Sequence, residues 1–335
     1  MKTARFYKHI LEFKRPGGTS RGVLHTKETF ILEITYNGKK GVGECALFRG
    51  LSADDVPDYE EKLQWLCTHI NAEETELKEV LKHYPSIWFG YEQACRNLEF
   101  GGSLYFPSLF TERKGFITIN GLIWMGDVAF MEEQIQEKLE AGFFCIKLKI
   151  GVNWPEEKKV LTTLRSKFSK DQLELRVDAN GGFTFEQAKT VLQELAALDI
   201  HSIEQPIKKS GNPAEMAALC QSTPVPIALD EELIGIVEKS EKQKLLEFIK
   251  PQYIILKPSL VGGFSGTDEW IAAADAVGAG WWITSALESN IGLNAIAQYT
   301  FTKNNLMPQG LGTGALFTNN FESALTLKGD LLYFK

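Results

Sequence analysis

From about residue 116 onward, short apolar runs rich in β-branched and aromatic residues alternate with longer helical stretches. Apolar runs of this length, bounded by turn residues, are typical of buried strands. Strands that alternate with helices predict a parallel sheet. The predicted strands are residues 116–120, 145–150, 173–179, 201–207, 225–230, 253–258, 280–286 and, more weakly, 307–312.

The helices between these strands have recognisable ends. One stops at Gly142, a common helix terminator, and another opens with Thr184 and Gln187 at the spacing of a capping box. About eight strands in roughly 200 residues favour a closed β/α barrel over an open doubly wound sheet, which stays the alternative. No GxGxxG follows the first strand, so a dinucleotide fold has little support. The predicted helices are residues 131–142, 184–198, 240–249 and 268–280.

The first 110 or so residues have a different pattern. Residues 30–47 predict a hairpin that turns at Asn37-Gly38, the strongest short hairpin signal, and helices follow it. The last residues look like a second hairpin. The helices predicted here are residues 58–70 and 91–99, and the second hairpin is residues 325–335. We therefore expect an α+β domain over residues 1–112, a barrel over 113–314, and a C-terminal segment over 315–335 that packs back on the first domain.

Charged residues stand at or near the ends of five predicted strands. They are Lys149, Asp178, Glu204, Asp230 and Lys257, and each is 26 to 29 residues from the next, the length of one β/α unit. In a barrel such residues converge on the C-terminal rim, where active sites of this fold are built. A single charge at a strand end is usually a solvated edge or a helix cap. Five in successive units favour a functional site.

The three carboxylates in this series point to a metal ion. Asp178, Glu204 and Asp230 on adjacent strands would repel one another strongly without a counter-ion. Ligands that are all oxygen favour a hard cation, Mg²⁺ or Mn²⁺, over zinc. His201 begins its strand, so we expect it at the opposite rim in a structural role.

Two lysines in the run CIKLKI lie on one strand face. Lys147 and Lys149 are two positions apart, and the apolar residues between and around them occupy the other face. Lys149 precedes the carboxylates and Lys257 follows them, so in a barrel the two would face each other across the metal. This arrangement suits removal of a proton next to a carboxylate, because the cation stabilises the negative charge that develops. Lys147 and the metal would together lower the pKa of Lys149 and help it act as a base.

Composition narrows the class of partner and the compartment. The net charge of −7 gives no basic surface for nucleic acid or an anionic membrane. Five scattered cysteines without a CxxC pair suit thiols in a reducing compartment, and the first residues lack the apolar core of a signal peptide. The longest apolar stretch, residues 271–287, contains Asp275 and two glycines, so it is no membrane span. We expect a cytoplasmic protein acting on a small molecule; the sequence gives no signal for its oligomeric state.

Read in order, these motifs resemble the enolase superfamily, and within it the muconate lactonizing enzyme subgroup. The motifs are KxK (Lys147, Lys149), VDAN (Asp178, Asn180), IEQP (Glu204), ALDE (Asp230, Glu231) and LKPS (Lys257). The resemblance covers nearly the whole chain. It implies a modified TIM barrel, (β/α)₇β, with an α+β capping domain.

The resemblance also implies roles for these residues. Mg²⁺ would be bound by the three carboxylates, supported by Asn180 and Glu231, and Lys149 would be the general base with Lys257 opposite. The mandelate racemase subgroup uses a late histidine as base. No histidine follows His201, so that subgroup is disfavoured.

The subgroup contains several reactions: muconate cycloisomerisation, epimerisation of dipeptides or N-acylamino acids, and dehydration to o-succinylbenzoate. Residues near the last predicted strands of the barrel distinguish among them. Dipeptide epimerases of this type have a DxD pair near the last strand, whereas GLGTGALF (310–317) has no carboxylate. Residues 285–298, together with PQGLGTGALF, resemble the o-succinylbenzoate synthase family, which are lyases of menaquinone biosynthesis. That family would use Lys149 to remove the α-proton and to protonate the leaving hydroxyl on the same face. Lys257 would be a cation beside the ring, and Lys147 would hydrogen-bond the substrate carboxylate.

A second carboxylate, on the succinyl chain of the substrate, needs hydrogen-bond donors. The candidates are Ser289, at the start of a helix, and the segment Gly312, Thr313 and Gly314. Ser289 fits a plain N-cap equally well.

Two loops of the first domain, residues 15–22 and 46–52, are expected to close the barrel mouth and exclude water. Arg21 and Arg49 lie in these loops. They are candidates for attracting a dianionic substrate, although an ordinary solvated role is favoured for both.

Two rival functions stay open. An N-acylamino acid racemase or dipeptide epimerase of the same superfamily would need both Lys149 and Lys257 as bases, one on each face of the substrate. A catalytically silent barrel acting as a binding protein belongs to a different class. Every expected catalytic position is filled in this sequence, which disfavours the silent barrel.

Overall fold

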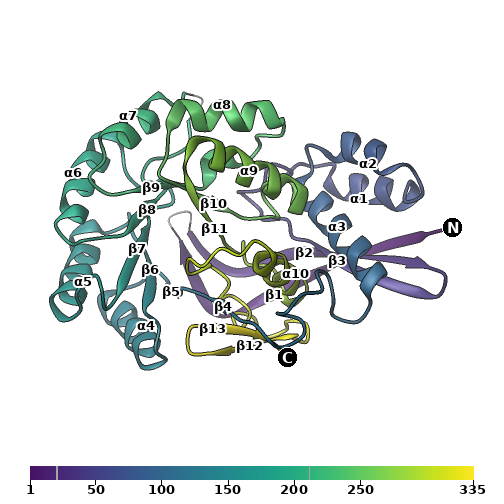
Figure 1. Cartoon of the computed structure of the whole chain (residues 1–335), viewed down its shortest axis with the longest axis horizontal. Coiled ribbons are helices and arrows are strands. Elements are labelled where there is room, and N and C mark those ends of the chain that lie inside the picture. The colour runs from purple at the N-terminus through teal and green to yellow at the C-terminus, as the bar shows by residue number, and fades with distance from the viewer. Residues whose placement is uncertain (20–21, 211) are drawn as a thin grey trace.

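The computed structural model of the chain describes residues 1–19, 22–210 and 212–335, so Arg21 lies outside the described residues. The N-terminal part combines an antiparallel sheet, in the order β1-β2-β3, with helices packed on one side of it (Figure 1). These elements are β1 (Thr3–Thr19), β2 (Gly22–Tyr36), β3 (Lys39–Cys45), α1 (Tyr59–Thr68), α2 (Glu74–Leu81) and α3 (Pro85–Phe100). We use the name capping domain for residues 3–100, which contain these six elements.

The predicted hairpin turn is confirmed. Asn37 and Gly38 join β2 to β3 with φ of 49° and 74°, values that suit a tight hairpin turn. Helix α3 packs so close to β3 that only glycine fits at position 43. A Cβ atom on Gly43 would lie 2.0 Å from the carbonyl oxygen of Gly90. Helix α2 is an addition to the helices expected from the sequence.

Within the described residues, seven strands form a parallel sheet in the order β11-β10-β9-β8-β7-β6-β5. The sheet curls, and its helices lie on the outside (Figure 1). Six predicted strands are confirmed, each shorter than expected. The strands are β5 (Gly121–Ile123), β6 (Cys145–Lys149), β7 (Glu174–Asp178), β8 (Ser202–Glu204), β9 (Ile227–Leu229), β10 (Tyr253–Leu256) and β11 (Gly280–Ile283). The helices are α4 (Val128–Glu140), α5 (Trp154–Lys167), α6 (Phe185–Ala196), α7 (Ala214–Ser222), the short 3₁₀ turn η1 (Glu231–Leu233), α8 (Lys239–Ile249), α9 (Gly263–Val277) and α10 (Asn290–Thr302).

The first predicted strand, residues 116–120, is wrong as a member of the parallel sheet. Its residues Ile117–Thr118 form β4, which pairs antiparallel with β13 (Leu331–Phe334) near the C-terminus. The first parallel strand is β5, which begins directly after this segment. The predicted hairpin at the end of the chain is confirmed as β12 (Leu325–Lys328) and β13.

The weakly predicted strand at residues 307–312 is reduced to two isolated bridges. Gln309 bridges Ile119 at one edge of the parallel sheet, and Gly310 bridges Thr284 at the other edge. One short segment therefore connects both edges of the curled sheet.

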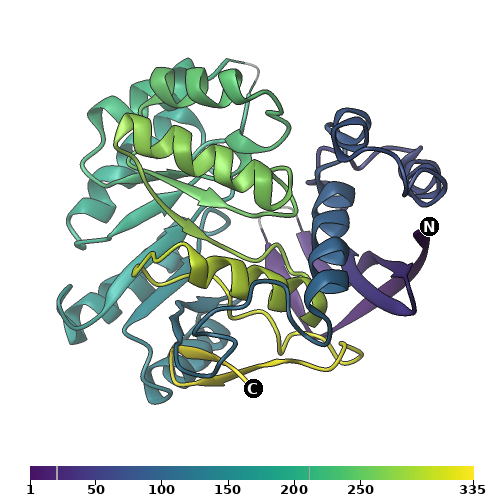
Figure 2. The ribbon, with the colours of Figure 1, turned by 45° about the vertical axis from the view of Figure 1, so that its right-hand side comes forward.

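The C-terminal segment contacts the capping domain as well as β4. Phe317 forms a bridge with Phe13 on β1, and the amide of Thr318 donates to the carbonyl of Glu12 at 2.8 Å. In Figure 2 the C-terminal strands lie along the bottom of the molecule, and α1 to α3 stand to one side. The end of the chain thus joins both parts of the fold.

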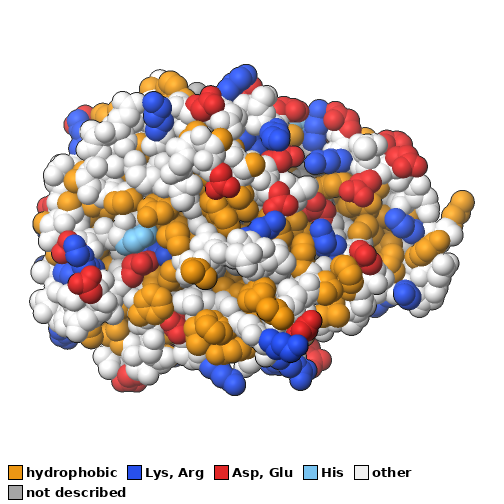
Figure 3. All heavy atoms as spheres, viewed as in Figure 1, with side chains coloured by type: hydrophobic (Ala, Val, Ile, Leu, Met, Phe, Trp, Pro, Cys, Tyr) orange, Lys and Arg blue, Asp and Glu red, His pale blue; other side chains and the backbone are white. Residues whose placement is uncertain are grey.

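Apolar side chains form one large buried cluster around the parallel sheet and a second between the capping sheet and its helices. Charged side chains of both signs are interspersed over the face in Figure 3, with apolar side chains between them. None of the described helices has the length and apolar character that crossing a membrane requires.

Candidate active site

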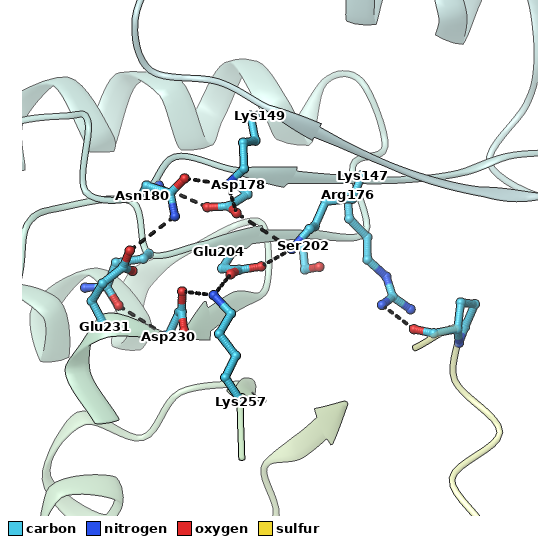
Figure 4. Close-up of polar contacts among 12 residues, drawn as sticks. Lys147, Lys149, Arg176, Asp178, Asn180, Ser202, Glu204, Asp230, Glu231 and Lys257 are labelled. Carbon is cyan, nitrogen blue, oxygen red and sulfur yellow. Dashed lines mark hydrogen bonds and ion pairs between the residues drawn. The ribbon is translucent and has the colours of Figure 1, made fainter. Parts of the chain in front are cut away.

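The five predicted charges meet at the carboxyl ends of the parallel strands (Figure 4). Lys149 is paired in register with Asp178, and Asp178 with Glu204, across β6, β7 and β8. Asp230 directly follows β9, and Lys257 directly follows β10. Because parallel strands end at the same edge, residues far apart in sequence become neighbours.

Lys147 and Lys149 each bind a carboxylate of the next strands. The Nζ of Lys149 lies 2.8 Å from Oδ2 of Asp178. The Nζ of Lys147 lies 2.7 Å from Oε2 of Glu204 and 3.7 Å from Oδ2 of Asp178. Both lysines therefore point to the same interior, while Ile146 and Leu148 belong to the apolar cluster on the other side of the strand.

Lys257 reaches Glu204 from the opposite direction and also contacts Asp230. It forms an ion pair with Oδ2 of Asp230, and its Nζ is 3.4 Å from Oε1 of Glu204. Glu204 consequently lies between Lys147 and Lys257. The described site combines three lysines with three carboxylates, all largely buried.

Burial and ion pairing have opposing effects on these groups. Burial alone would raise the pKa of Asp178, but Lys149 and Lys147 outweigh it and hold that pKa well below its usual range. Burial raises the pKa of Asp230 well above its usual value, although the ammonium of Lys257 opposes the shift. Burial would lower the pKa of Lys147, yet the carboxylates of Glu204 and Asp178 raise it overall.

Asn180 connects Lys149 to a further carboxylate. Its Oδ1 accepts a hydrogen bond from Lys149 at 2.6 Å, and its Nδ2 donates to Oε1 of Glu231 at 3.1 Å. Its backbone amide donates to Oδ1 of Asp178 at 3.0 Å. Asn180 is therefore placed to orient Lys149.

The donor set fits a hard divalent cation. Asp178, Glu204 and Asp230 offer only oxygen ligands, and each neighbouring pair shares the ammonium of a lysine, so positive charge already lies between them. Within the described ranges, no three histidine, cysteine, aspartate or glutamate side chains surround one point closely enough to hold an ion as they stand. A cation at this position would take over the neutralising role of the lysine ammonium groups.

A cavity opens above the lysines. Phe48 and Leu51 of the predicted loop 46–52 line it from the capping domain, whereas Arg49 forms ion pairs with Asp55 and Glu28. Its lining residues are Phe48, Leu51, Asn120, Leu122, Trp124, Lys147, Lys149, Asp178, Asn180, Lys257, Thr284, Ser285, Ala286, Leu287, Gly310, Gly312 and Thr313. An apolar wall over a charged floor suits a small molecule with both a ring and a carboxylate.

Several lining residues were not identified from the sequence, and two of them, Asn120 and Thr284, have buried polar atoms without a partner among the described residues. These atoms are Oδ1 of Asn120 and Oγ1 of Thr284. Both lie beside Gln309 and Gly310, where the segment 309–310 bridges the two sheet edges. Their only sequence signal was a polar residue next to a short strand, which is too common to be informative.

The predicted substrate-binding residues divide into two groups. Gly312 and Thr313 line the cavity, but Gly314 and Ser289 are not among its lining residues. Ser289 is 0% exposed; its hydroxyl caps α10 by accepting from the amide of Ile291 and donates to Glu44. The N-cap alternative is thus the one the structure shows. His201 packs near Tyr253, at the start of β10, away from the charged rim.

Comparisons with known proteins agree with this architecture. Residues 130–329 match the family model described as Enolase C-terminal domain-like, and residues 1–98 match the MenC N-terminal domain. An o-succinylbenzoate synthase of Desulfotalea psychrophila is 44% identical over 355 residues, covering 96% of each chain. An L-Ala-D/L-Glu epimerase of Francisella tularensis subsp. novicida is 24% identical, covering 82% of this chain and 80% of that one.

Solved structures give the same picture. The crystal structure of MenC from Desulfotalea psychrophila has a TM-score of 0.88 and 40% identity, and the match covers 99% of both chains. A substrate-liganded L-Ala-D/L-Glu epimerase from Bacillus subtilis has a TM-score of 0.84 at 20% identity, covering 99% of this chain and 95% of that one. The second likeness concerns the fold alone.

Proposed function

This chain belongs to the o-succinylbenzoate synthase family of the enolase superfamily, and from this membership we propose its reaction. The protein is a hydro-lyase that dehydrates 2-succinyl-6-hydroxy-2,4-cyclohexadiene-1-carboxylate to o-succinylbenzoate in menaquinone biosynthesis. The observation on which this conclusion rests is the 44% identity to an o-succinylbenzoate synthase over 96% of both chains. The charged floor and apolar wall of the cavity support it.

We assign the proton transfers to Lys149. Its Nζ accepts the proton on the carbon that bears the substrate carboxylate, and the electron pair of the broken C–H bond is first held by that carbon and its carboxylate. This pair then forms the new ring double bond as the C–O bond to the hydroxyl breaks, and Lys149 returns its proton to the leaving oxygen, so water departs and the ring becomes aromatic. Asp178 and Asn180 hold Lys149 in position for both transfers.

We assign Lys257 the role of a fixed cation. It lies on the far side of the carboxylates from Lys149, paired with Asp230 and Glu204. A cation beside the ring attracts its π electrons and the developing negative charge. Lys147, at the cavity floor, donates a hydrogen bond to the substrate carboxylate.

We propose that Mg²⁺, with Mn²⁺ as the alternative, binds to Asp178, Glu204 and Asp230. When bound, the ion acts as a Lewis acid that stabilises negative charge on the substrate carboxylate. Asn180 and Glu231 support this ligand set through their mutual hydrogen bond. Gly312 and Thr313 contact the succinyl end of the substrate at the cavity wall.

We also propose the finer architecture and the compartment. The bridges at Gln309 and Gly310 would close the sheet as a (β/α)₇β barrel, with the boundaries 1–112, 113–314 and 315–335. The supporting observation for a cytoplasmic location is that all five cysteines are free thiols.

The test is a spectroscopic assay of the cyclohexadiene substrate with Mg²⁺, since the product gains an aromatic ring. We expect turnover by the unaltered protein, a loss of about 10²–10⁴-fold in kcat for Lys149→Ala, and loss of activity after chelation that Mg²⁺ restores. Lys159→Ala, at an exposed lysine on α5, is the control and should leave kcat unchanged. Absence of turnover, together with epimerisation of a dipeptide or N-acylamino acid panel, would reverse the assignment in favour of the racemase alternative.

A further inference from the structure

Two helices of the parallel-sheet part begin against a glutamate of the capping domain. Glu44 on β3 accepts from backbone amides at the start of α10, and Glu92 on α3 accepts from those of Phe264 and Ser265 at the start of α9. The first amides of a helix have no partner within it and lie at its positive end, so a carboxylate there is favourable. In both cases the cap is donated by the other domain.

The Glu44 carboxylate is completely enclosed. It is 0% exposed and accepts four hydrogen bonds, from the hydroxyls of Thr29 and Ser289 at 2.8 and 2.5 Å and from the amides of Ser289 and Gly292, both at 2.9 Å. Burial lowers the pKa of Lys27, and the nearby Glu44 carboxylate opposes that shift. A carboxylate with every lone pair engaged holds the start of α10 in one position relative to β3.

The residue before this cap organises the wall of the cavity. Glu288 accepts from the hydroxyl of Ser285 at 2.6 Å and from the amide of Ala286 at 2.7 Å, and Thr313 donates to Ser285 at 2.8 Å. Ser285, Ala286 and Thr313 all line the cavity. A displacement of Ser289 would therefore move the wall that contacts substrate.

Glu92 makes the corresponding contact without this connection. Its hydrogen bonds to Phe264 and Ser265 are 2.5 and 3.1 Å, so it joins the two domains just as Glu44 does. Neither Phe264 nor Ser265 is among the cavity-lining residues. Glu44 and Glu92 therefore make similar contacts between the two domains, but only the contact of Glu44 is connected to the cavity wall. The effects of substituting the two residues can be compared directly.

We propose that Glu44 is a positioning residue of the active site, which fixes the loop 285–289 and so sets the cavity wall that binds substrate. The proposal rests on the proposed function, because substrate binding is what the wall is taken to serve. Glu44 takes no part in proton transfer. Its effect is on affinity for substrate and product.

The test compares Glu44→Gln with Glu92→Gln, using KM, kcat and the dissociation constant for the product o-succinylbenzoate. The amide side chain at position 44 has an NH₂ group in place of one carboxylate oxygen. This group cannot accept a hydrogen bond, so one of the four donors is left without an acceptor and the start of α10 shifts. We expect Glu44→Gln to raise KM and the product Kd by about tenfold with kcat within about threefold, and Glu92→Gln to change KM by less than about twofold. If Glu44→Gln does not fold, Ser289→Ala removes one of the four hydrogen bonds and should raise KM about threefold.

The outcomes separate the two proposals. Equal KM values for Glu44→Gln and Glu92→Gln in an active enzyme would mean that Glu44 serves only to join the domains, which overturns the inference and leaves the function intact. A fall in kcat with KM unchanged would also overturn it. Failure of the unaltered protein to convert the substrate would overturn the proposed function and this inference together.

Discussion

Every charged residue of the candidate site has a partner of opposite sign, and this sets the consequence of changing any one of them. Glu204 contacts both Lys147 and Lys257, so loss of either lysine still leaves one counter-charge beside it. Asp178 is similarly placed between Lys147 and Lys149. Removal of one partner from a buried ion pair leaves the charge of the other partner uncompensated. These residues are therefore coupled, and the effects of substituting them on stability and activity will not be additive.

Asn180 offers a prediction that separates orientation from proton transfer. Its side chain holds Lys149 at 2.6 Å, and its φ of 44° lies in a region that glycine adopts freely. We expect Asn180→Gly to lower kcat by about tenfold or more, because Lys149 loses the acceptor that aims it, while the fold is retained. The measurement is steady-state kinetics alongside a thermal unfolding curve. A kcat equal to that of the unaltered protein would show that Asp178 alone orients the base.

Some residues of the candidate site could be predicted from the sequence, and others could not. The charges at strand ends could be predicted because parallel strands end together, so sequence spacing translates directly into proximity. Glu44 could not, because its partner Ser289 lies 245 residues away and no local pattern connects them. The polar atoms of Asn120 and Thr284, which have no hydrogen-bond partner among the described residues, lie beside the bridges of segment 309–310, which also arise only in the folded chain.

At the level of elements, strands enclosed on both faces were the most predictable. The runs 145–150 and 173–179 have apolar residues at every second position, and they became β6 and β7. β5 has three residues and β4 has two, so neither contains enough alternation to show which sheet it joins. The assignment of residues 116–120 failed for that reason, since its partner is a hairpin near the end of the chain.

Helix α6 gives a prediction about stability. Thr184 and Gln187 form the expected capping box, with the amide of Gln187 donating to Oγ1 of Thr184 at 3.3 Å and the amide of Thr184 donating to Oε1 of Gln187 at 2.9 Å. Thr184→Ala should lower the free energy of unfolding by about 1 kcal/mol, because one N-terminal amide loses its acceptor. Urea unfolding measures this change. Thr184→Ser keeps the hydroxyl and is the matched control; if both variants lost the same stability, the cap would not be the cause.

Considered as a whole, the molecule has a domain boundary that includes a group titrating near neutrality. Burial raises the pKa of Glu92 from 4.5 to about 7, against hydrogen bonds from Ser265 and Phe264 that lower it. The folded protein therefore keeps this proton at pH values where the unfolded chain has released it. Its contribution to stability is fully present below about pH 4.5 and is lost as the pH rises through 7.

The titration of Glu92 can be tested by comparing the stability of the unaltered protein with that of Glu92→Gln. Between pH 4.5 and 7 the unaltered protein should lose up to about 3 kcal/mol of unfolding free energy relative to Glu92→Gln, measured by urea unfolding at several pH values. Asp54, whose pKa burial raises to about 6, is present in both proteins and cancels. Glu99→Gln, at an exposed position on the same helix, is the control for removing one carboxylate from α3. A pH-independent difference for Glu92→Gln would place its titration outside this range.

The pairing of β4 with β13 has a consequence for how the protein is made. Thr118 leaves the ribosome about 200 residues before its partner Leu331, a delay of roughly 10–40 s at typical rates of synthesis. Segment 309–310, which bridges both sheet edges, also arrives late. During elongation both edges of the nascent sheet lack their pairing partners, so they can form hydrogen bonds with strands of other chains. The protein can therefore complete these pairings only after residues 309–310 and β13 have been synthesised, so their docking is a late step of assembly.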